Sequence, residues 1–211
     1  MSLNMGQDML APGFCDPVLA SQAVFRTVME ALARPGSVAV VDAAVAAPAP
    51  LGAAAGALAL TLLDFDTPVW LDPALAGASE TGGWFKFHTG APLTTDPGAA
   101  AFAFIAEPAR MPDFEDFCRG SLEYPDRSTT LVLQVEHLSE GDGFKLSGPG
   151  IKGTRTLSAA PLPPGFTDRM AANRALFPRG LDIILTCGRR LAALPRSVHL
   201  AELVRLAKEH A

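Results

Sequence analysis

The stretch LDIILTC, residues 181–187, is an almost uninterrupted apolar run. A strand with one face in water alternates apolar and polar side chains, whereas a strand covered on both faces does not. The run therefore predicts a central strand of a sheet that has a covering layer on each side. Such strands are typical of α/β proteins, in which helices provide the covering layers.

Helices and strands interleave on either side of this run. Asp16-Pro17 is a good helix opening, because aspartate caps the helix and proline fits its first turn, and the helix ends at Arg34-Pro35-Gly36. Further helices are predicted over about 51–63 and 167–176. Strands are predicted at 37–41, 67–71, 84–89, 101–106, 130–135 and 191–194, with a weaker one at 144–146. From Val198 onward the spacing is helical, although the first of these residues could be extended.

The order of these elements predicts the domain organisation. Neither a linker nor a low-complexity segment divides the chain, and no internal repeat is visible. We therefore expect a single α/β layered domain over residues 13–211, with a mixed β-sheet and helices on both faces. Residues 1–12 are expected to be a flexible N-terminus.

Composition excludes several classes of function. The chain of 211 residues is 49% hydrophobic and only 18% charged, which suggests that a partner covers part of its surface. A net charge of −5 argues against nucleic acid as a ligand. The three cysteines lie far apart without a CxxC pair, and the four histidines show no metal-ligand spacing. We therefore expect reduced thiols and no metal site.

A membrane span is also not expected. No charged residue occurs between Asp42 and Asp64, a length that could cross a bilayer. The segment is mostly alanine, however, and Pro48 and Pro50 would break a helix, so a buried core helix is the better interpretation. The N-terminus lacks the basic region and apolar core of a signal peptide. The sequence thus predicts a cytoplasmic protein.

One glycine-rich stretch fits a nucleotide-binding pattern. GPGIKG, residues 148–153, matches GxGxxG, but that loop needs a helix N-terminus after it, on which the pyrophosphate rests. The residues that follow, TRTL, are typical of a strand. We therefore expect a hairpin turn here, since glycines supply the positive φ angles of such turns.

A basic pair occurs in FKFHT, residues 85–89. As a strand, this stretch would place Phe85 and Phe87 on one face and Lys86 and His88 on the other. His88 could act as an acid or base near neutral pH. The alternative is a structural histidine, satisfied by a neighbouring carbonyl group at the end of the strand.

Polar residues gather before two predicted strands. In Asp126-Arg127-Ser128 no nearby histidine is available to activate the serine as a nucleophile. Arg127 is interpreted either as a phosphate fork or as an ion-pair partner of Asp126 or Asp182, near the sheet edge beside His88. The stretch from Arg179 to Asp182 likewise places an arginine and an aspartate at the start of a predicted strand, the apolar run 181–187. Charges so near a core must be paired or bind something.

Seven stretches together resemble a known family. They are DPVLASQAVFRTVMEALARPG, DTPVWL, FKFHTGAPL, EYPDRSTTLVLQV, LSGPGI, FPRGLDIILTC and LPRSVHL, in this order over nearly the whole chain. They resemble the H-subunit family of bacterial carbon–phosphorus lyase, which takes part in phosphonate metabolism. The resemblance implies a fold like the large domain of pyridoxal-phosphate-dependent transferases, but without the cofactor. None of the four lysines lies in a setting typical of a Schiff base: Lys86, Lys145, Lys152 and Lys208.

The resemblance also implies partners and a reaction. Members form homodimers and join the G, I and J subunits in a core complex. That complex converts ATP and an alkylphosphonate into ribose 1-alkylphosphonate 5-triphosphate and adenine. The resemblance supplies no catalytic residue.

Two interpretations of the function follow. In the first, the chain is a non-catalytic scaffold subunit. In the second, it binds or converts substrate, with arginines and a histidine around a triphosphate or phosphonate. The candidate ligand-binding residues are His88, Asp126, Arg127, Ser128, Arg179, Asp182 and Arg196. Whether these side chains converge in one cleft distinguishes the two interpretations.

Overall fold

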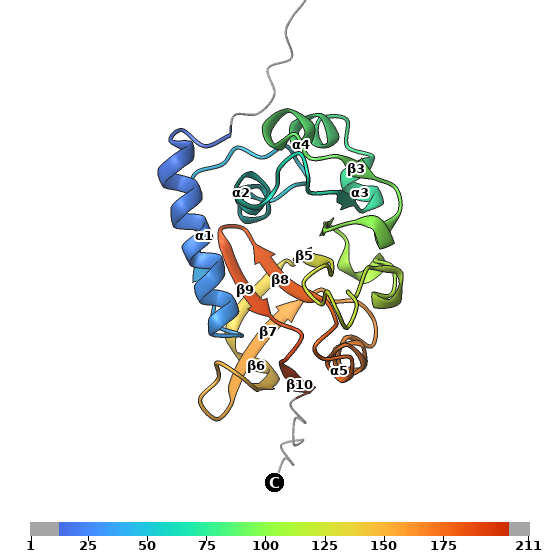
Figure 1. Ribbon diagram of the computed structural model, residues 1–211. Helices are drawn as coiled ribbons and strands as arrows, with labels where there is room; N and C mark the ends of the chain where they lie inside the picture. The colour runs from blue at the N-terminus through green and yellow to red at the C-terminus, as the bar shows by residue number, and fades with distance from the viewer. Residues whose placement is uncertain (1–12, 203–211) are drawn as a thin grey trace, which may run out of the picture.

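The structure is a computed structural model that describes residues 13–202. The predicted flexible N-terminus, 1–12, and the helical spacing beyond residue 202 lie outside the described residues. The centre of the fold is a mixed sheet of seven strands (Figure 1). Its order is β1 (Ala39–Val40), β9 (Arg190–Leu194), β8 (Asp182–Cys187), β5 (Thr130–Gln134), β4 (Phe102–Ile105), β2 (Val69–Leu71) and β3 (Leu93–Thr94).

Five of these strands are parallel, in the order β3-β2-β4-β5-β8. The chain starts at β2, adds β3 on one side, and then crosses to β4 and the strands beyond it on the other side. This is the 2-1-3-4-5 order of one class of doubly wound sheets. In such sheets ligands bind between the carboxyl ends of the two strands whose connections leave in opposite directions, here β2 and β4.

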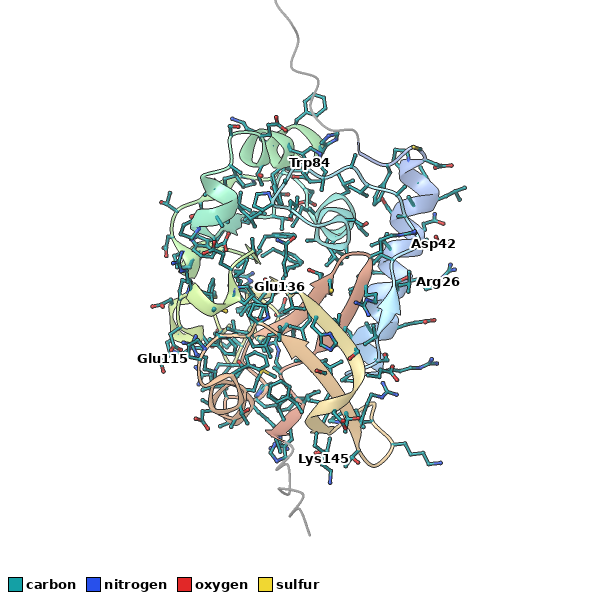
Figure 2. The ribbon with its side chains drawn as sticks, turned by 180° about the vertical axis from the view of Figure 1, so that it is seen from behind. Arg26, Asp42, Trp84, Glu115, Glu136 and Lys145 are labelled. Atoms are coloured by element: carbon teal, nitrogen blue, oxygen red, sulfur yellow. The ribbon has the colours of Figure 1, made fainter. Side chains whose placement is uncertain are left out.

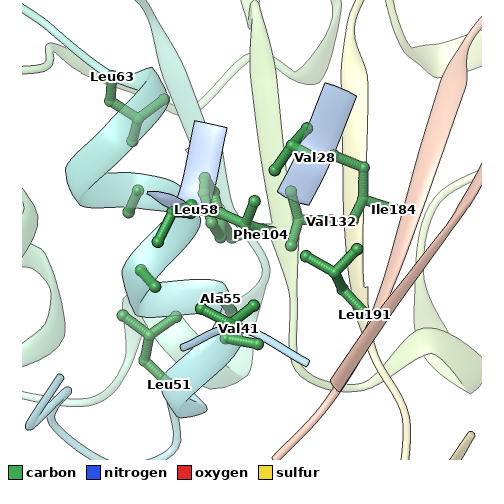
Figure 3. Close-up of a cluster of buried hydrophobic side chains, with 14 of the residues drawn as sticks. Val28, Val41, Leu51, Ala55, Leu58, Leu63, Phe104, Val132, Ile184 and Leu191 are labelled. Atoms are coloured by element: carbon green, nitrogen blue, oxygen red, sulfur yellow. The ribbon is translucent and has the colours of Figure 1, made fainter. Parts of the chain in front are cut away.

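Helices cover one face of the sheet. They are α1 (Pro17–Ala33), α2 (Ala53–Leu62), the short α3 (Pro73–Ala76) and α4 (Thr81–Thr89). As expected, the Asp16 carboxylate caps α1 and accepts from the Leu19 amide at 3.1 Å. Val28 and Leu58 from the helices pack with Phe104, Val132 and Ile184 from the strands (Figure 3). The alternating residues of the same strands point to the other face.

The other face differs from the prediction. It is covered by an antiparallel sheet of β10 (His199–Glu202), β6 (His137–Ser147) and β7 (Arg155–Ala160), together with α5 (Phe166–Ala175). The 3₁₀ turns η1 (Pro97–Ala99), η2 (Pro108–Arg110) and η3 (Phe114–Asp116) lie in the connections. The prediction of helices on both faces is thus only partly correct. The full length of β6 was not predicted because polar residues and glycines, such as Gly141 and Gly143, interrupt its apolar pattern. The pairing of β6 with β7 shifts register between Glu140 and Phe144.

Residues 84–89 form a helix and not the predicted strand. The buried or half-buried residues Thr81, Trp84, Phe85 and His88 recur at helical spacing, whereas Phe87 is 71% exposed. The alternation of phenylalanine with Lys86 and His88 suggested a period of two, but it is too short to outweigh the longer helical pattern. The helix α4 ends at a glycine with φ of 71°, which is a common helix stop.

Up to residue 194 the other predicted elements are confirmed within one or two residues at most ends, except that the weak strand 144–146 is the last part of the longer β6. The helical spacing expected from Val198 is wrong for His199–Glu202, which form β10, in line with the extended alternative. Residues 148–153 form the turn between β6 and β7, with positive φ at Gly148, Gly150 and Gly153, and no helix begins there. Across residues 13–202, none of the helices has both the length and the apolar character that crossing a membrane requires.

Candidate functional site

Arg196 gathers several of the predicted site residues at the amino edge of the parallel strands. Asp182, the first residue of β8, holds it in a fork: Nε donates to Oδ1 at 3.2 Å and Nη2 to Oδ2 at 2.6 Å. The backbone amide of Arg196 also donates to the same carboxylate at 2.9 Å. The two side chains are only 14% and 26% exposed, respectively. This is a largely buried, bidentate ion pair of the strong kind.

The rest of the guanidinium joins two turns. Nη2 donates to the Ser128 hydroxyl oxygen at 2.6 Å. Nη1 donates to the carbonyl oxygens of Pro125 at 2.7 Å and of Pro178 at 3.3 Å. An arginine has five N–H donors, and all five are used here. Arg196 therefore has no donor left for a phosphate.

Backbone contacts hold the same turns in place. Arg119 and Ser128 form an isolated antiparallel bridge, and the Gly180 amide donates to the Arg119 carbonyl oxygen at 2.9 Å. The buried hydroxyl group of Thr129 donates to the Ala100 carbonyl oxygen at 2.6 Å. The chain from 119 to 128 is thus fastened to the sheet and to the turn that follows α5.

Arg127 does not make the predicted ion pair. It is exposed and lies over the ring of Tyr124, 4.3 Å from its centroid, and it makes no ion pair in residues 13–202. The physical reason is twofold. Asp182 is taken by Arg196, and Arg127 still lies in an exposed turn, three residues before β5 begins, where water solvates its charge. The neighbouring Asp126 is exposed as well.

Arg179 lies next to this cluster in the chain. Its Nε is buried, and within the described part of the protein no acceptor is found for it. The residue follows Pro178, whose carbonyl oxygen binds Arg196. Arg179 is therefore the candidate residue whose side chain still lacks a hydrogen-bond acceptor within residues 13–202.

His88 lies elsewhere. It is carried by α4, at the opposite end of the molecule from β10 and α5 in Figure 1, and its ring lies against those of Trp84 and Phe87. The prediction that Arg127 sits beside His88 is therefore wrong. Of the seven predicted residues, the structure joins Ser128, Asp182 and Arg196 directly, and places Asp126, Arg127 and Arg179 on the two turns that Arg196 holds.

None of the seven predicted residues lines any of five surface hollows among residues 13–202. These hollows have volumes of about 290 to 430 Å³. Residues 13–202 also contain no group of three or more histidine, cysteine or carboxylate side chains suited to a metal ion.

Asp72 is a key residue that the sequence reasoning missed. It follows β2 and is 2% exposed. Its Oδ1 accepts from the Leu75 amide of α3 at 3.0 Å, and its Oδ2 accepts from the amides of Ala106 and Glu107, after β4, each at 2.9 Å. This carboxylate thus occupies the ligand position between the carboxyl ends of β2 and β4. The available signal was Asp72-Pro73, the same helix opening as Asp16-Pro17, directly after a strand.

Comparison with known proteins agrees over most of the chain. The family model described as "Bacterial phosphonate metabolism protein (PhnH)" matches residues 12–201. The chain is 49% identical over 187 residues to "Alpha-D-ribose 1-methylphosphonate 5-triphosphate synthase subunit PhnH" of Rhizobium meliloti (strain 1021), covering 89% of this chain and 93% of the relative. It is 38% identical over 81 residues to "Putative C-P lyase subunit protein HtxG" of Stutzerimonas stutzeri, covering 38% and 42% of the two chains.

Proposed function

Because the chain belongs to the PhnH family of bacterial phosphonate metabolism proteins, we propose that it is a non-catalytic structural subunit of a C–P lyase complex. The complex would act in the cytoplasm on ATP and an alkylphosphonate, giving ribose 1-alkylphosphonate 5-triphosphate and adenine. The chain would hold the other subunits together without contacting these substrates.

The observation that carries this proposal is that all five N–H donors of the Arg196 side chain bind groups of this chain. Three stretches that carry the family resemblance meet at this residue: EYPDRSTT through Pro125 and Ser128, FPRGLD through Pro178 and Asp182, and LPRS through Arg196 itself. A substrate arginine needs free donors that point into a cleft. In this chain the donors of Arg196 instead bind Asp182 and the two turns at Pro125–Ser128 and Pro178, which is the role expected of a structural residue.

The carboxyl edge of the sheet supports the same proposal. Anionic ligands of doubly wound sheets bind the free amides at this edge. In this chain the amides of Leu75, Ala106 and Glu107 already bind the Asp72 carboxylate. A phosphate placed here would have to displace a buried charge of its own sign.

The partners belong to the proposal too. We propose a homodimer that joins the G, I and J subunits, and a relationship between the mixed seven-stranded sheet and the large domain of pyridoxal-phosphate-dependent transferases without their cofactor. The outer face of α1 supports the dimer: Val18, Leu19, Phe25 and Met29 are 49–66% exposed, and no charged residue occurs from Pro17 to Phe25. Exposed apolar surface of this kind marks protein contacts.

The experiment is reconstitution of the complex from its purified subunits with and without this chain. We expect the chain to co-purify with the other subunits, and its omission to prevent stable assembly and therefore product formation. A complex that assembles and turns over normally without the chain would refute the proposal.

The alternative is a substrate-binding subunit. Arg127 and the buried Nε of Arg179 favour it, because neither has a carboxylate partner among the described residues. It predicts that variants at these positions assemble normally but bind ATP or phosphonate weakly. Kinetics of the assembled complex distinguish the two functions.

A further inference from the structure

Two exposed turns lie side by side because one nitrogen holds both. Arg196 Nη1 binds the carbonyl oxygens of Pro125 and Pro178, and the residues just before these prolines are Tyr124 and Phe177. Tyr124 is 49% exposed and Phe177 65%, while Leu122, on the first turn, is 74% exposed. The two turns that Arg196 holds together therefore expose three large apolar side chains to solvent.

Holding three large apolar side chains in water is unfavourable for the isolated chain. Large apolar groups lose stabilisation when they remain in water, and ordered turns that carry them mark sites of protein contact. Fixing the turns in advance also reduces the entropy that a partner's binding must overcome. Aromatic side chains and arginines are the residues that contribute most binding energy at interfaces.

The charges on these turns are incompletely paired. Arg127 lies over the ring of Tyr124, and Arg179 Nε is buried with no acceptor in residues 13–202. Glu123 and Asp126, on the same turn, are exposed, and neither forms an ion pair with these arginines. Since buried donors are almost always satisfied in complete structures, Arg179 needs an acceptor that residues 13–202 do not supply.

We propose that Leu122, Tyr124, Arg127, Phe177 and Arg179 form a docking face for another subunit of the complex. That subunit presents a carboxylate to Arg179, flanked by apolar side chains that pack on Tyr124 and Phe177. A hollow of about 340 Å³ beside Phe177, lined also by Pro149, Arg174 and Ser197, is large enough to take one of them. This inference rests on the proposed function, because it names the surface through which the scaffold binds.

An unlike subunit fits this face better than a second copy of the chain. The exposed apolar residues of α1, proposed above as the homodimer contact, are on the opposite flank of the molecule. Figure 2 shows Arg26 of α1 and Glu115, from the segment that leads to these turns, on opposite sides of the molecule. The two surfaces therefore allow both partners to bind at once.

The test is the affinity of the chain for the complex assembled without it, measured by surface plasmon resonance. We expect Tyr124→Ser, Phe177→Ser and Arg179→Met each to weaken binding at least tenfold. The matched control is Phe65→Ser, which removes a phenylalanine that is 74% exposed elsewhere on the surface, and it should bind like the wild type. Thermal melting of each variant verifies the fold, and Arg179→Met should melt no lower than the wild type, since it removes an unsatisfied buried donor.

Each other outcome overturns the inference. If the wild type binds and the three variants bind equally well, the docking face is elsewhere while the proposed function stands. If the wild type does not bind, both fail together. If Arg179→Met assembles normally and only turnover is lost, Arg179 holds an anionic substrate. If the variants dissociate the homodimer but still bind the other subunits, the face lies between copies of this chain.

Discussion

Arg196 shows how much one side chain contributes to this fold. It joins β8, the turn before β5 and the turn after α5 through a buried carboxylate, a hydroxyl and two carbonyl groups. Removing one partner of a buried pair leaves the other charge uncompensated, which typically costs about 3–5 kcal/mol. We therefore expect Arg196→Met to lower the free energy of unfolding by about that amount in urea titrations.

Arg110→Met is the matched control for this variant. Arg110 also forms an ion pair, with Glu107, but its side chain is 82% exposed, so the change should stay within about 0.5 kcal/mol. Equal stability of the two variants would show that Arg196 does not hold the turns.

Asp72 permits a second test at the same scale. In Asp72→Asn one carboxylate oxygen becomes an NH2 group, which cannot accept, so at least one of the backbone N–H donors of Leu75, Ala106 and Glu107 loses its acceptor. Hydrogen bonds to charged groups contribute about 1.5–3 kcal/mol, and we expect a loss of at least this size in chemical denaturation. Asp96→Asn is the control, because this exposed carboxylate caps a 3₁₀ turn through Gly98, a role that asparagine fills equally well. Similar losses in both variants would contradict the account of Asp72.

The sequence named Ser128, Asp182 and Arg196 as candidates but did not show that they meet. Asp182 and Ser128 are 14 and 68 residues from Arg196, and such contacts are determined by the pairing of β5 with β8. For the same reason Arg127 was assigned the wrong partner. Local charge patterns indicate that a charge needs compensation, but they do not identify the group that supplies it.

Helix α4 shows where local patterns mislead at the scale of an element. The strand interpretation places Phe85 and Phe87 on one face, whereas the helix buries Phe85 fully and leaves Phe87 71% exposed. Phe85→Ala should therefore lower the free energy of unfolding by about 3–5 kcal/mol, and Phe87→Ala should change it by less than about 0.5 kcal/mol. Equal losses of stability for the two variants in thermal or urea unfolding would instead support the interpretation of residues 84–89 as a strand.

The central sheet was predictable because its strands are short apolar runs between clear turn signals. Residues 181–187 and 130–135 became β8 and β5 almost unchanged. Parts of β6 and β7 were predicted, at 144–146 and in TRTL after the 148–153 turn, and β10 matches the extended alternative after Val198. That these strands form a second sheet was not predicted, because they are half exposed and interrupted by glycines, and because their pairing joins His199 to Ser147. Long-range antiparallel pairing leaves little trace in any one stretch.

The homodimer is a prediction at the scale of the whole molecule. Light scattering at micromolar concentration should give about twice the chain mass of 22.1 kDa. Phe25→Asp should shift this mass toward that of one chain, because Phe25 is 50% exposed and lies among the exposed apolar residues of α1. Lys152→Asp, in the β6–β7 turn, is the control and should remain dimeric. A wild type that scatters as a monomer would contradict the dimer itself.

The central claim is that this chain supports the assembly of the complex without contacting substrate. The most direct test is steady-state kinetics of the reconstituted complex, with rates expressed per assembled complex, for wild type and a His88→Ala, Arg127→Ala double variant. Both side chains lie outside the hydrogen-bond network of Arg196 and have some exposure to solvent. The account predicts that kcat, and KM for ATP and the alkylphosphonate, stay within about twofold of the wild type. A tenfold rise in KM or fall in kcat at unchanged assembly would contradict it.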